Sequence, residues 1–133
     1  MSRIYLDTSV VIGLVEGTEG RRAVLDSRLE LTRTGSDVVF VSELVRYECL
    51  VGPRRNGNEA LAFAFEQFFL AEKISVLPVD RTVFDRAIDI RARKRFSTPD
   101  ALHLAAALVS RCDVFLTGDR ELARFDGIPV EVL

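Results

Sequence analysis

The sequence predicts an α/β protein with a central parallel sheet of four to five strands flanked by helices. Three observations lead to this prediction. Short apolar runs of strand length alternate with longer segments in which apolar residues recur at helical spacing. One run, Val38–Val41, is wholly apolar, as expected for a strand buried on both faces of a parallel sheet. The regular alternation of the two kinds of segment favours helices on both sides of the sheet, a three-layer sandwich.

Each element follows from an apolar run and the turn residues that bound it. The expected strands are Arg3–Leu6, Val38–Val41, Ile74–Val79, Val114–Thr117 and Val130–Leu133. The expected helices are Thr8–Glu16, Arg21–Arg33, Glu43–Val51, Glu59–Glu72, Arg81–Arg95, Asp100–Val109 and Arg120–Phe125.

Turn and capping residues set the boundaries in the first half of the chain. Gly17 and Gly20 are expected to separate the first two helices, and residues 35–37 to form the turn before the second strand. Ser42 is a good N-cap for the third helix. The Gly-Pro pair at residues 52–53 is expected to end that helix.

Similar signals organise the second half. Ser97 is a hydroxyl cap, and Pro99 stands where the first turn of a helix tolerates proline. The helix that follows, Asp100–Val109, is almost wholly apolar. In the preceding helix, Arg81–Arg95, the residues expected to face inward are Val83, Phe84, Ala87, Ile88 and Ala92.

Length and composition indicate one domain with a single hydrophobic core. The chain has 133 residues, of which 48% are hydrophobic and 29% charged, and its net charge is −2. No apolar stretch approaches the ~20 residues of a membrane span. Because the first residues lead directly into a strand, we expect no signal peptide. Cys49 and Cys112 are too few for a disulfide framework, so we expect buried, reduced thiols in a cytoplasmic protein.

Four acids lie close to the predicted carboxyl edge of the sheet. Asp7 ends the first strand, and Asp119 follows the fourth strand. Glu48 lies in the helix after the second strand, and Asp100 lies in the first turn of the helix before the fourth. Parallel strands with right-handed crossovers bring their carboxyl ends to one edge. We therefore expect the four side chains to meet there, with Asp100 among them if the helix that carries it folds back over that edge.

Carboxylates gathered in this way require neutralisation. Two like charges 4 Å apart repel by roughly 4 kcal/mol at an effective dielectric of 20. Oxygen ligands without a Cys/His cluster point to Mg²⁺ or Mn²⁺ rather than zinc. Such sites catalyse the metal-assisted attack of water on a phosphodiester. Thr8, Ser9 and Thr117 are placed to orient the carboxylates or a bound water.

Each acid also has a simpler interpretation. Asp7 is a possible helix cap. The negative charge of Asp100 in a first helical turn would interact favourably with the helix dipole. Asp119 follows Gly, and Asp is common in such turns. Glu48 alone fits a surface acid, and Glu43 competes with it for the same role. The argument for a site therefore depends on the set rather than on any one residue.

The set resembles a known family. The matching segments are Tyr5-Leu6-Asp7-Thr8-Ser9, Ser42 with Glu48, Thr98-Pro99-Asp100-Ala101-Leu102-His103-Leu104-Ala105-Ala106-Ala107, and Thr117-Gly118-Asp119. In this order and over nearly the whole length, they resemble the PIN-domain nucleases, and most closely the VapC-type toxins of toxin–antitoxin pairs.

The resemblance implies a PIN-like three-layer sandwich with endoribonuclease activity on an RNA substrate. It favours Glu48 over Glu43 and implies that Asp7, Glu48, Asp100 and Asp119 are the catalytic metal ligands, with Mg²⁺ as cofactor. It also implies homodimers and a cognate antitoxin protein that inserts a segment near the active site.

Other residues are candidates for substrate binding. Arg46, Arg54 and Arg55 would hold RNA phosphates if they flank the carboxylate edge. His103 lies three residues after Asp100, on nearly the same helical face, where it would touch substrate or tune the acids. Solvated surface is the simpler interpretation of the arginines, and a lone His is a poor metal site.

Three other functions remain to be weighed. A receiver domain needs an acid pair after the first strand and a suitably placed Lys, whereas Asp7 has no adjacent acid. An aspartyl phosphatase needs an acid two residues after Asp7, where Ser9 stands. A non-catalytic PIN-like module that binds RNA or a protein is the stronger alternative, although the presence of all four acids counts against it.

Overall fold

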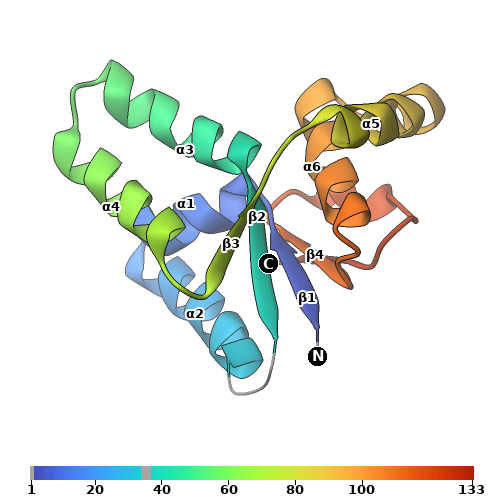
Figure 1. Cartoon of the computed structure of the whole chain (residues 1–133). Helices are drawn as coiled ribbons and strands as arrows, with labels where there is room; N and C mark the ends of the chain where they lie inside the picture. Colours follow the sequence, from blue (N-terminus) through green and yellow to red (C-terminus); the bar gives the residue numbers. More distant parts are fainter. Residues whose placement is uncertain (1, 34–36) are drawn as a thin grey trace.

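Five parallel strands form the sheet around which the chain is built (Figure 1). The computed structural model describes residues 2–33 and 37–133. The strands are β1 (Arg3–Leu6), β2 (Val38–Ser42), β3 (Ile74–Leu77), β4 (Val114–Thr117) and β5 (Val130–Val132). The helices are α1 (Thr8–Glu16), α2 (Glu19–Arg33), α3 (Glu43–Arg55), α4 (Glu59–Leu70), α5 (Arg81–Lys94), α6 (Thr98–Val109) and the 3₁₀ helix η1 (Arg120–Arg124). The predicted α/β class is confirmed.

Strand β1 lies at the centre of the sheet, whose order is β3-β2-β1-β4-β5. Tyr5 on this strand lies opposite Phe40 on β2 and Phe115 on β4. The chain first steps outward from β1 to β2 and β3, and then returns to place β4 on the other side of β1. Ligand sites of open parallel sheets lie at such a reversal, outside the carboxyl ends of the strands. The topology therefore predicts a ligand site at the residues that follow β1 and β4.

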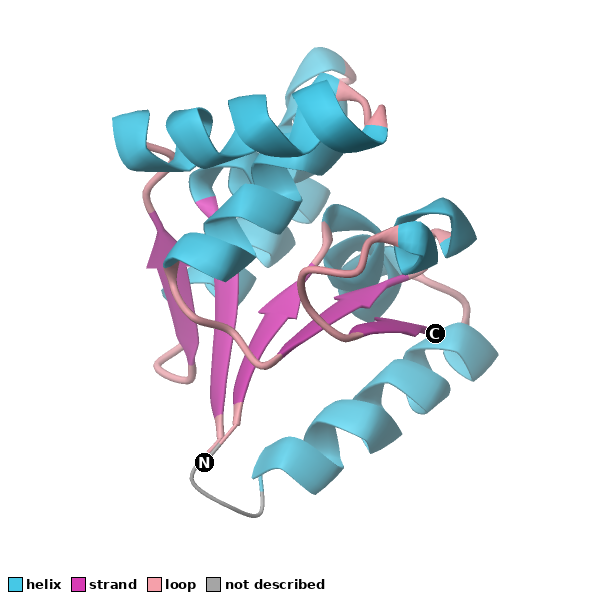
Figure 2. Ribbon diagram, turned by 90° about the vertical axis from the view of Figure 1, so that its right-hand side faces the viewer, coloured by secondary structure: helices cyan, strands magenta, loops and turns pink. Residues whose placement is uncertain are grey.

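The helices form one layer on each face of the sheet. Helices α1 to α4 lie on one side, and α5 and α6 lie on the other (Figure 1). Figure 2 shows the twisted sheet from a second side, with helices above and below it. Right-handed crossovers explain the division, because α1 to α4 connect strands that advance in one direction while α5 and α6 connect the return. The result is the expected three-layer sandwich.

Helix α6 is the most deeply buried helix of the described residues. Every residue from Ala101 to Ala107 is buried, which explains why the segment is apolar on all sides. The hydroxyl of Ser97 accepts the backbone N–H of Asp100 and caps the helix, as predicted. This cap places the first turn of α6 at the carboxyl edge of the sheet.

One predicted boundary is wrong for a clear reason. Helix α3 does not end before Gly52 and Pro53 but continues to Arg55. Proline lacks only its own N–H, so the residues beyond it still donate to carbonyls one turn back. The N–H of Asn56 donates to the carbonyl of Gly52 at 3.0 Å, and Pro53 is buried.

The other boundaries shift by a few residues. Helix α2 begins before the predicted Arg21, because the hydroxyl of Thr18 accepts the Arg21 N–H and starts the helix there. Strand β3 ends before Pro78, which cannot donate to a ladder. The predicted turn at residues 35–37 lies, apart from Asp37, outside the described residues.

The predicted inward face of α5 is partly wrong. Val83 and Ala87 are buried as expected, together with Ile90, which was not predicted. Phe84 and Ile88 are 47% and 63% exposed, and Ala92 is exposed as well. Helix α5 packs mainly against α6, so its other faces, including Phe84 and Ile88, are left to solvent.

The two cysteines are free and buried, as predicted. Burial raises the pKa of the Cys49 thiol and of the Cys112 thiol to about 12, so neither is a ready nucleophile. Within residues 2–33 and 37–133, no helix has the length and apolar character needed to cross a membrane.

Candidate active site at the carboxyl edge of the sheet

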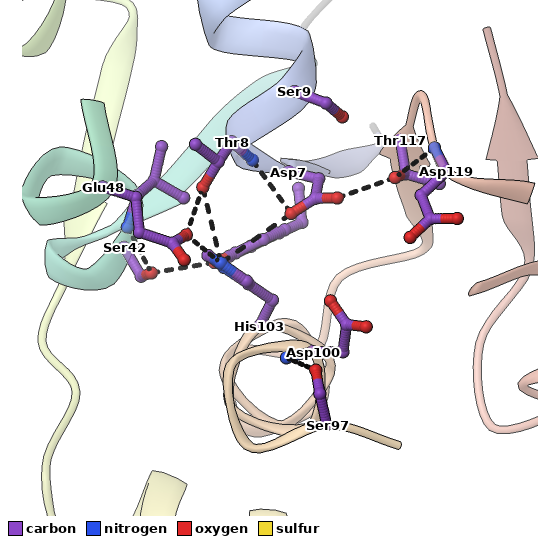
Figure 3. A network of polar contacts seen from close by, with 12 residues as sticks. Asp7, Thr8, Ser9, Ser42, Glu48, Ser97, Asp100, His103, Thr117 and Asp119 are labelled. Carbon is purple, nitrogen blue, oxygen red and sulfur yellow. Dashed lines mark hydrogen bonds and ion pairs between the residues drawn. The ribbon is translucent and has the colours of Figure 1, made fainter. Parts of the chain in front are cut away.

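The structure brings the four predicted acids to one edge of the sheet, each from a different element (Figure 3). Asp7 directly follows β1, and Asp119 lies two residues after β4. Glu48 comes from the first half of α3, and Asp100 comes from the first turn of α6. The edge therefore gathers residues that are up to 112 positions apart in the chain.

Asp7 is held by hydrogen bonds on both carboxylate oxygens. Its Oδ1 accepts the backbone N–H of Thr8 at 2.9 Å, so that it caps α1. Its Oδ2 accepts the hydroxyl of Thr117 at 2.7 Å. The residue is only 7% exposed, and burial of a carboxylate is costly unless it has hydrogen-bond partners of this kind. Capping and site formation are thus compatible roles of one residue.

Thr117 also fixes Asp119. Its Oγ1 accepts the backbone N–H of Asp119 at 3.0 Å while the same hydroxyl donates to Asp7. The carboxylate of Asp119 accepts the N–H of Glu121 and starts η1. Ser9 steadies the same turn, because its Oγ accepts the N–H of Gly118 at 2.9 Å. The hydroxyl residues thus set the turn that carries Asp119.

Glu48 is held from two sides. Its Oε1 accepts the hydroxyl of Thr8 at 2.6 Å and lies 2.7 Å from Nε2 of His103. A carboxylate only accepts hydrogen bonds, so Nε2 donates in this contact. Burial raises the pKa of Glu48, but the hydrogen bonds from His103 and Thr8 outweigh burial and hold it below its ordinary value. Glu48 is therefore ionised at neutral pH.

The pKa of Asp100 is shifted in the opposite direction, above its ordinary value. Burial raises the pKa of Asp100, the bond at Ser97 opposes that effect, and the negative charges of Asp7 and Asp119 raise it further. Figure 3 shows the carboxylate of Asp100 directed toward the space between Asp7 and Asp119. Three carboxylates thus share one region. Among the described residues, none of the three is paired with a Lys or Arg.

The donors match a hard divalent cation in kind. Carboxylate oxygens are the ligands that Mg²⁺ and Mn²⁺ prefer, and the mutual repulsion felt at Asp100 is relieved by a positive charge. The four carboxylates are not closed around one point, however. In the part of the chain that the structure describes, no three His, Cys, Asp or Glu side chains are gathered closely enough to hold a metal ion.

The two competing acids of α3 are clearly separated. Glu43 is exposed, and its carboxylate lies 3.6 Å from Arg46 one turn away. Glu48 faces Thr8 and His103 instead. The geometry places Glu48, and not Glu43, at the carboxylate edge.

Among the described residues, the three predicted substrate-binding arginines form no ion pair with the four acids, whereas His103 contacts Glu48. Arg46 is engaged by Glu66, at 2.9 Å, and by Glu43. Arg54 and Arg55 are exposed in the last turn of α3, at the opposite end from its start beside the site (Figure 1). His103 is 2% exposed and so offers no surface to a substrate.

A buried hydrogen-bond network that the sequence analysis did not identify connects Glu48 to the core through His103. The hydroxyl of Tyr5 lies 2.9 Å from Nδ1 of His103 and donates to Oγ of Ser42 at 2.8 Å. Burial raises the pKa of Tyr5 well above its ordinary value, so the phenol stays neutral. The sequence contained a signal for Tyr5, because it lies two residues before Asp7 and alternate residues of an extended segment point to the same face.

Arg21 is a second residue that the sequence gave no reason to select. Its guanidinium lies against Gly118, where a Cβ would be 3.2 Å from Nη2. The contact joins α2 to the turn before Asp119, two segments with no shared pattern in the sequence.

Comparison with known proteins agrees with this architecture. The family model of the PIN domain matches residues 4–128. The structure of VapBC2 from Rickettsia felis bound to a promoter DNA fragment aligns with a TM-score of 0.82 at 13% identity, covering 98% of each chain. VapC20 from Mycobacterium tuberculosis, a sarcin–ricin loop cleaving toxin, aligns with a TM-score of 0.68 at 22% identity, covering 93% of this chain and 90% of that one.

FitAcB from Neisseria gonorrhoeae aligns with a TM-score of 0.68 at 20% identity, covering 96% of this chain and 95% of that one. No curated protein matches the sequence. The structural similarities support the fold, and the family model spans nearly the whole chain. The chain therefore belongs to the PIN domain family.

Proposed function

We propose that the chain is a metal-dependent endoribonuclease that acts as the toxin of a type II toxin–antitoxin pair. The observation that carries the proposal is the group of Asp7, Asp100 and Asp119, which face one region without a Lys or Arg partner among the described residues. A fold whose stability is reduced by such repulsion gains from a cation, and functional sites commonly contain groups with shifted pKa values.

The proposed cofactor is Mg²⁺, with Mn²⁺ as the alternative, held by the carboxylates of Asp7, Glu48, Asp100 and Asp119. When bound, the ion supplies the Lewis acid for attack of water on an RNA phosphodiester. Thr8 and Thr117 fix the direction of the Asp7 carboxylate. Hydrogen bonds from His103 and Thr8 keep Glu48 ionised and fix the orientation of its carboxylate.

The toxin role is supported by the structural neighbours. VapC20 is described as a toxin that cleaves the sarcin–ricin loop, and another similar structure is a toxin–antitoxin complex from Klebsiella pneumoniae, with a TM-score of 0.70 at 19% identity. We extend the toxin role from these proteins to this chain. The proposed location is the cytoplasm, where RNA is available and the thiols of Cys49 and Cys112 stay reduced.

The proposed partners are a cognate antitoxin and a second copy of the chain. The described surface exposes several large apolar side chains that a partner would cover: Val24, Tyr47, Phe63, Leu70, Phe84 and Ile88. Light scattering of the purified protein tests the homodimer, since a monomeric mass at micromolar concentration contradicts it. Co-purification with the product of the neighbouring reading frame tests the antitoxin.

Incubation of the purified protein with mixed RNA tests the proposed activity. We expect cleavage with Mg²⁺ and none with EDTA, together with growth arrest when the protein is expressed without its antitoxin. Cleavage that persists in EDTA contradicts the metal-dependent mechanism. RNA binding without cleavage in either condition favours the alternative, a non-catalytic module.

A further inference from the structure

Beside the candidate active site lies a cation, Arg21, that has no acidic partner among the described residues. Arg21, in the first turn of α2, extends its side chain across α1 to the turn that precedes Asp119. A Cβ added to Gly13 would lie 3.7 Å from Cγ and Nε of Arg21, and one added to Gly118 would lie 3.2 Å from Nη2. Within residues 2–33 and 37–133, the guanidinium forms no ion pair or hydrogen bond.

The absence of a side chain at Gly118 makes room for this guanidinium. A Cβ there would approach both Nη2 of Arg21 and Oγ of Ser9, the latter at 3.3 Å. These distances are shorter than ordinary van der Waals contact, so an alanine would displace one or both groups. Ser9 is already fixed by the N–H of Gly118. Arg21 therefore lies against the backbone of the turn, half-buried, with its charge beside the site.

The guanidinium lies on the Ser9 side of Gly118, because a Cβ at Gly118 would approach both Nη2 of Arg21 and Oγ of Ser9. Figure 3 shows Ser9 on one side of Thr117 and the carboxylate of Asp119 on the other, toward Asp100. The Asp119 carboxylate is directed to the N–H of Glu121, which explains why it does not pair with Arg21. The cation thus flanks the group of acids without neutralising it.

An unpaired guanidinium in this position matches the chemistry of a phosphate. Two parallel N–H groups bind two phosphate oxygens, which an ammonium does not reproduce. RNA carries a phosphate at every nucleotide, so a strand whose scissile bond lies at the acids places its neighbouring phosphates beside them. The acids repel those phosphates, and a cation at their border offsets the repulsion.

We propose that Arg21 binds the phosphate of a nucleotide that flanks the cleaved bond. The inference rests on the proposed function, because it requires RNA at the carboxylate edge. Arg21 is then a substrate-binding residue outside the set of metal ligands. It would position the strand and contribute affinity, while the carboxylates carry the reaction.

Binding of a labelled single-stranded RNA tests the inference. The measurement uses Asp100→Asn, which is expected to bind RNA in Mg²⁺ without cutting it, with Arg21→Gln or Arg21→Lys added. We expect Arg21→Gln to weaken binding by about 10-fold. Arg21→Lys should weaken it less, since Lys keeps the positive charge but loses the two parallel N–H groups of the guanidinium. The slope of log K against log salt concentration should fall by about 0.7 in Arg21→Gln, the loss of one phosphate contact to a single strand.

Arg111→Gln is the matched control. It removes the same group from an exposed residue in the turn before β4, at the opposite edge of the sheet. We expect its affinity to stay within about twofold, because only the long-range charge changes. Thermal unfolding of each variant separates a binding role from a structural one, since a purely structural Arg21 lowers the melting temperature and leaves the RNA affinity of the folded protein unchanged.

The outcomes separate this inference from the proposed function. If wild-type protein cleaves RNA with Mg²⁺ while Arg21→Gln binds RNA as tightly as Arg111→Gln, only the role of Arg21 is overturned. If wild-type protein neither binds nor cleaves RNA, the proposed function is overturned and the inference with it. A higher KM in otherwise wild-type Arg21→Gln, with kcat changed much less, supports the role of Arg21 in binding.

Discussion

Nε2 of His103 lies 2.7 Å from Oε1 of Glu48, and this contact joins the buried helix α6 to α3 at the edge of the sheet. On its other side the imidazole meets the hydroxyl of Tyr5 on the central strand. His103 thus connects an acid of the candidate site to the core. A residue that hydrogen-bonds to a metal ligand, as His103 does to Glu48, orients that ligand and does not bind the metal ion itself.

Replacement of His103 by Asn should therefore reduce RNA cleavage by about 10-fold, a typical effect of losing a supporting hydrogen bond. It should also lower the free energy of unfolding by about 1–3 kcal/mol, because Tyr5 and Glu48 each lose a partner. Cleavage kinetics and urea unfolding measure the two effects. Tyr5→Phe is the control, since it keeps the Glu48 contact and should lower stability while cleavage persists. Wild-type cleavage by His103→Asn contradicts the positioning role.

The low pKa of Glu48 has a consequence for stability as a function of pH. Its pKa in the folded protein lies below the ordinary value of 4.5, so ionised Glu48 stabilises the fold above that pH. The contribution is lost as the pH falls through the lowered pKa. Urea unfolding in EDTA should show wild-type protein more stable than Glu48→Gln near neutral pH, with the gap closing in acid.

Glu43→Gln is the comparison for this prediction. Glu43 is exposed on the same helix and, within the described part of the chain, pairs only with Arg46. Its replacement should therefore change neither the pH profile nor cleavage appreciably. Glu48→Gln should reduce cleavage strongly. Equal effects of the two variants on cleavage contradict the assignment of Glu48 to the site.

Asp100 leads to the opposite prediction. Burial and the charges of Asp7 and Asp119 raise its pKa, so the ionised form destabilises the metal-free fold at neutral pH. Asp100→Asn should therefore raise the melting temperature in EDTA by a few degrees while abolishing cleavage, as expected where a site is optimised for activity.

Addition of Mg²⁺ completes that experiment. A ligand that binds only the folded state stabilises it, so Mg²⁺ should raise the melting temperature of wild-type protein more than that of Asp100→Asn. A variant that is less stable than wild-type protein in EDTA shows instead that the ionised side chain of Asp100 stabilises the first turn of α6.

Thr117 offers a test of carboxylate orientation. Its hydroxyl donates to Asp7 and accepts from the backbone of Asp119. Thr117→Val keeps the shape and removes both bonds, so cleavage should fall by about 10-fold, corresponding to a hydrogen bond to a charged group. Thr117→Ser keeps the hydroxyl and should retain most of the activity. If the two variants cleave alike, the hydroxyl does not orient the site.

The class and order of elements were readable from the sequence because they depend on local patterns. Alternating apolar runs predict a parallel sheet, and caps such as Ser42 and Ser97 act within one helical turn. The errors arose where tertiary packing decides. Phe84 and Ile88 have the spacing of core residues, yet α5 packs mainly against α6 through its other face and leaves them exposed.

In the candidate site, too, some placements follow from local sequence patterns and others depend on tertiary packing. The placement of Asp7 and Asp119 follows from strand ends, which parallel topology brings together. The partners of Glu48 depend on how α3 approaches α6, and the place of Arg21 depends on how α2 crosses α1. Neither packing relationship leaves a periodic signal in one sequence. Arg46, Arg54 and Arg55 were selected by charge alone, and charge does not specify a position in space.

The central claim is that the four carboxylates form a catalytic metal site, and the rate of RNA cleavage by Asp7→Asn tests it most directly. Asn keeps the oxygen that caps α1 and removes the charge that would bind the ion. The measurement compares cleavage and RNA binding of wild-type protein and the variant in Mg²⁺. We expect cleavage to fall by about 100-fold or more, the scale of losing a central electrostatic group, while RNA binding and folding persist. Cleavage at the wild-type rate by a folded Asp7→Asn protein would contradict the account.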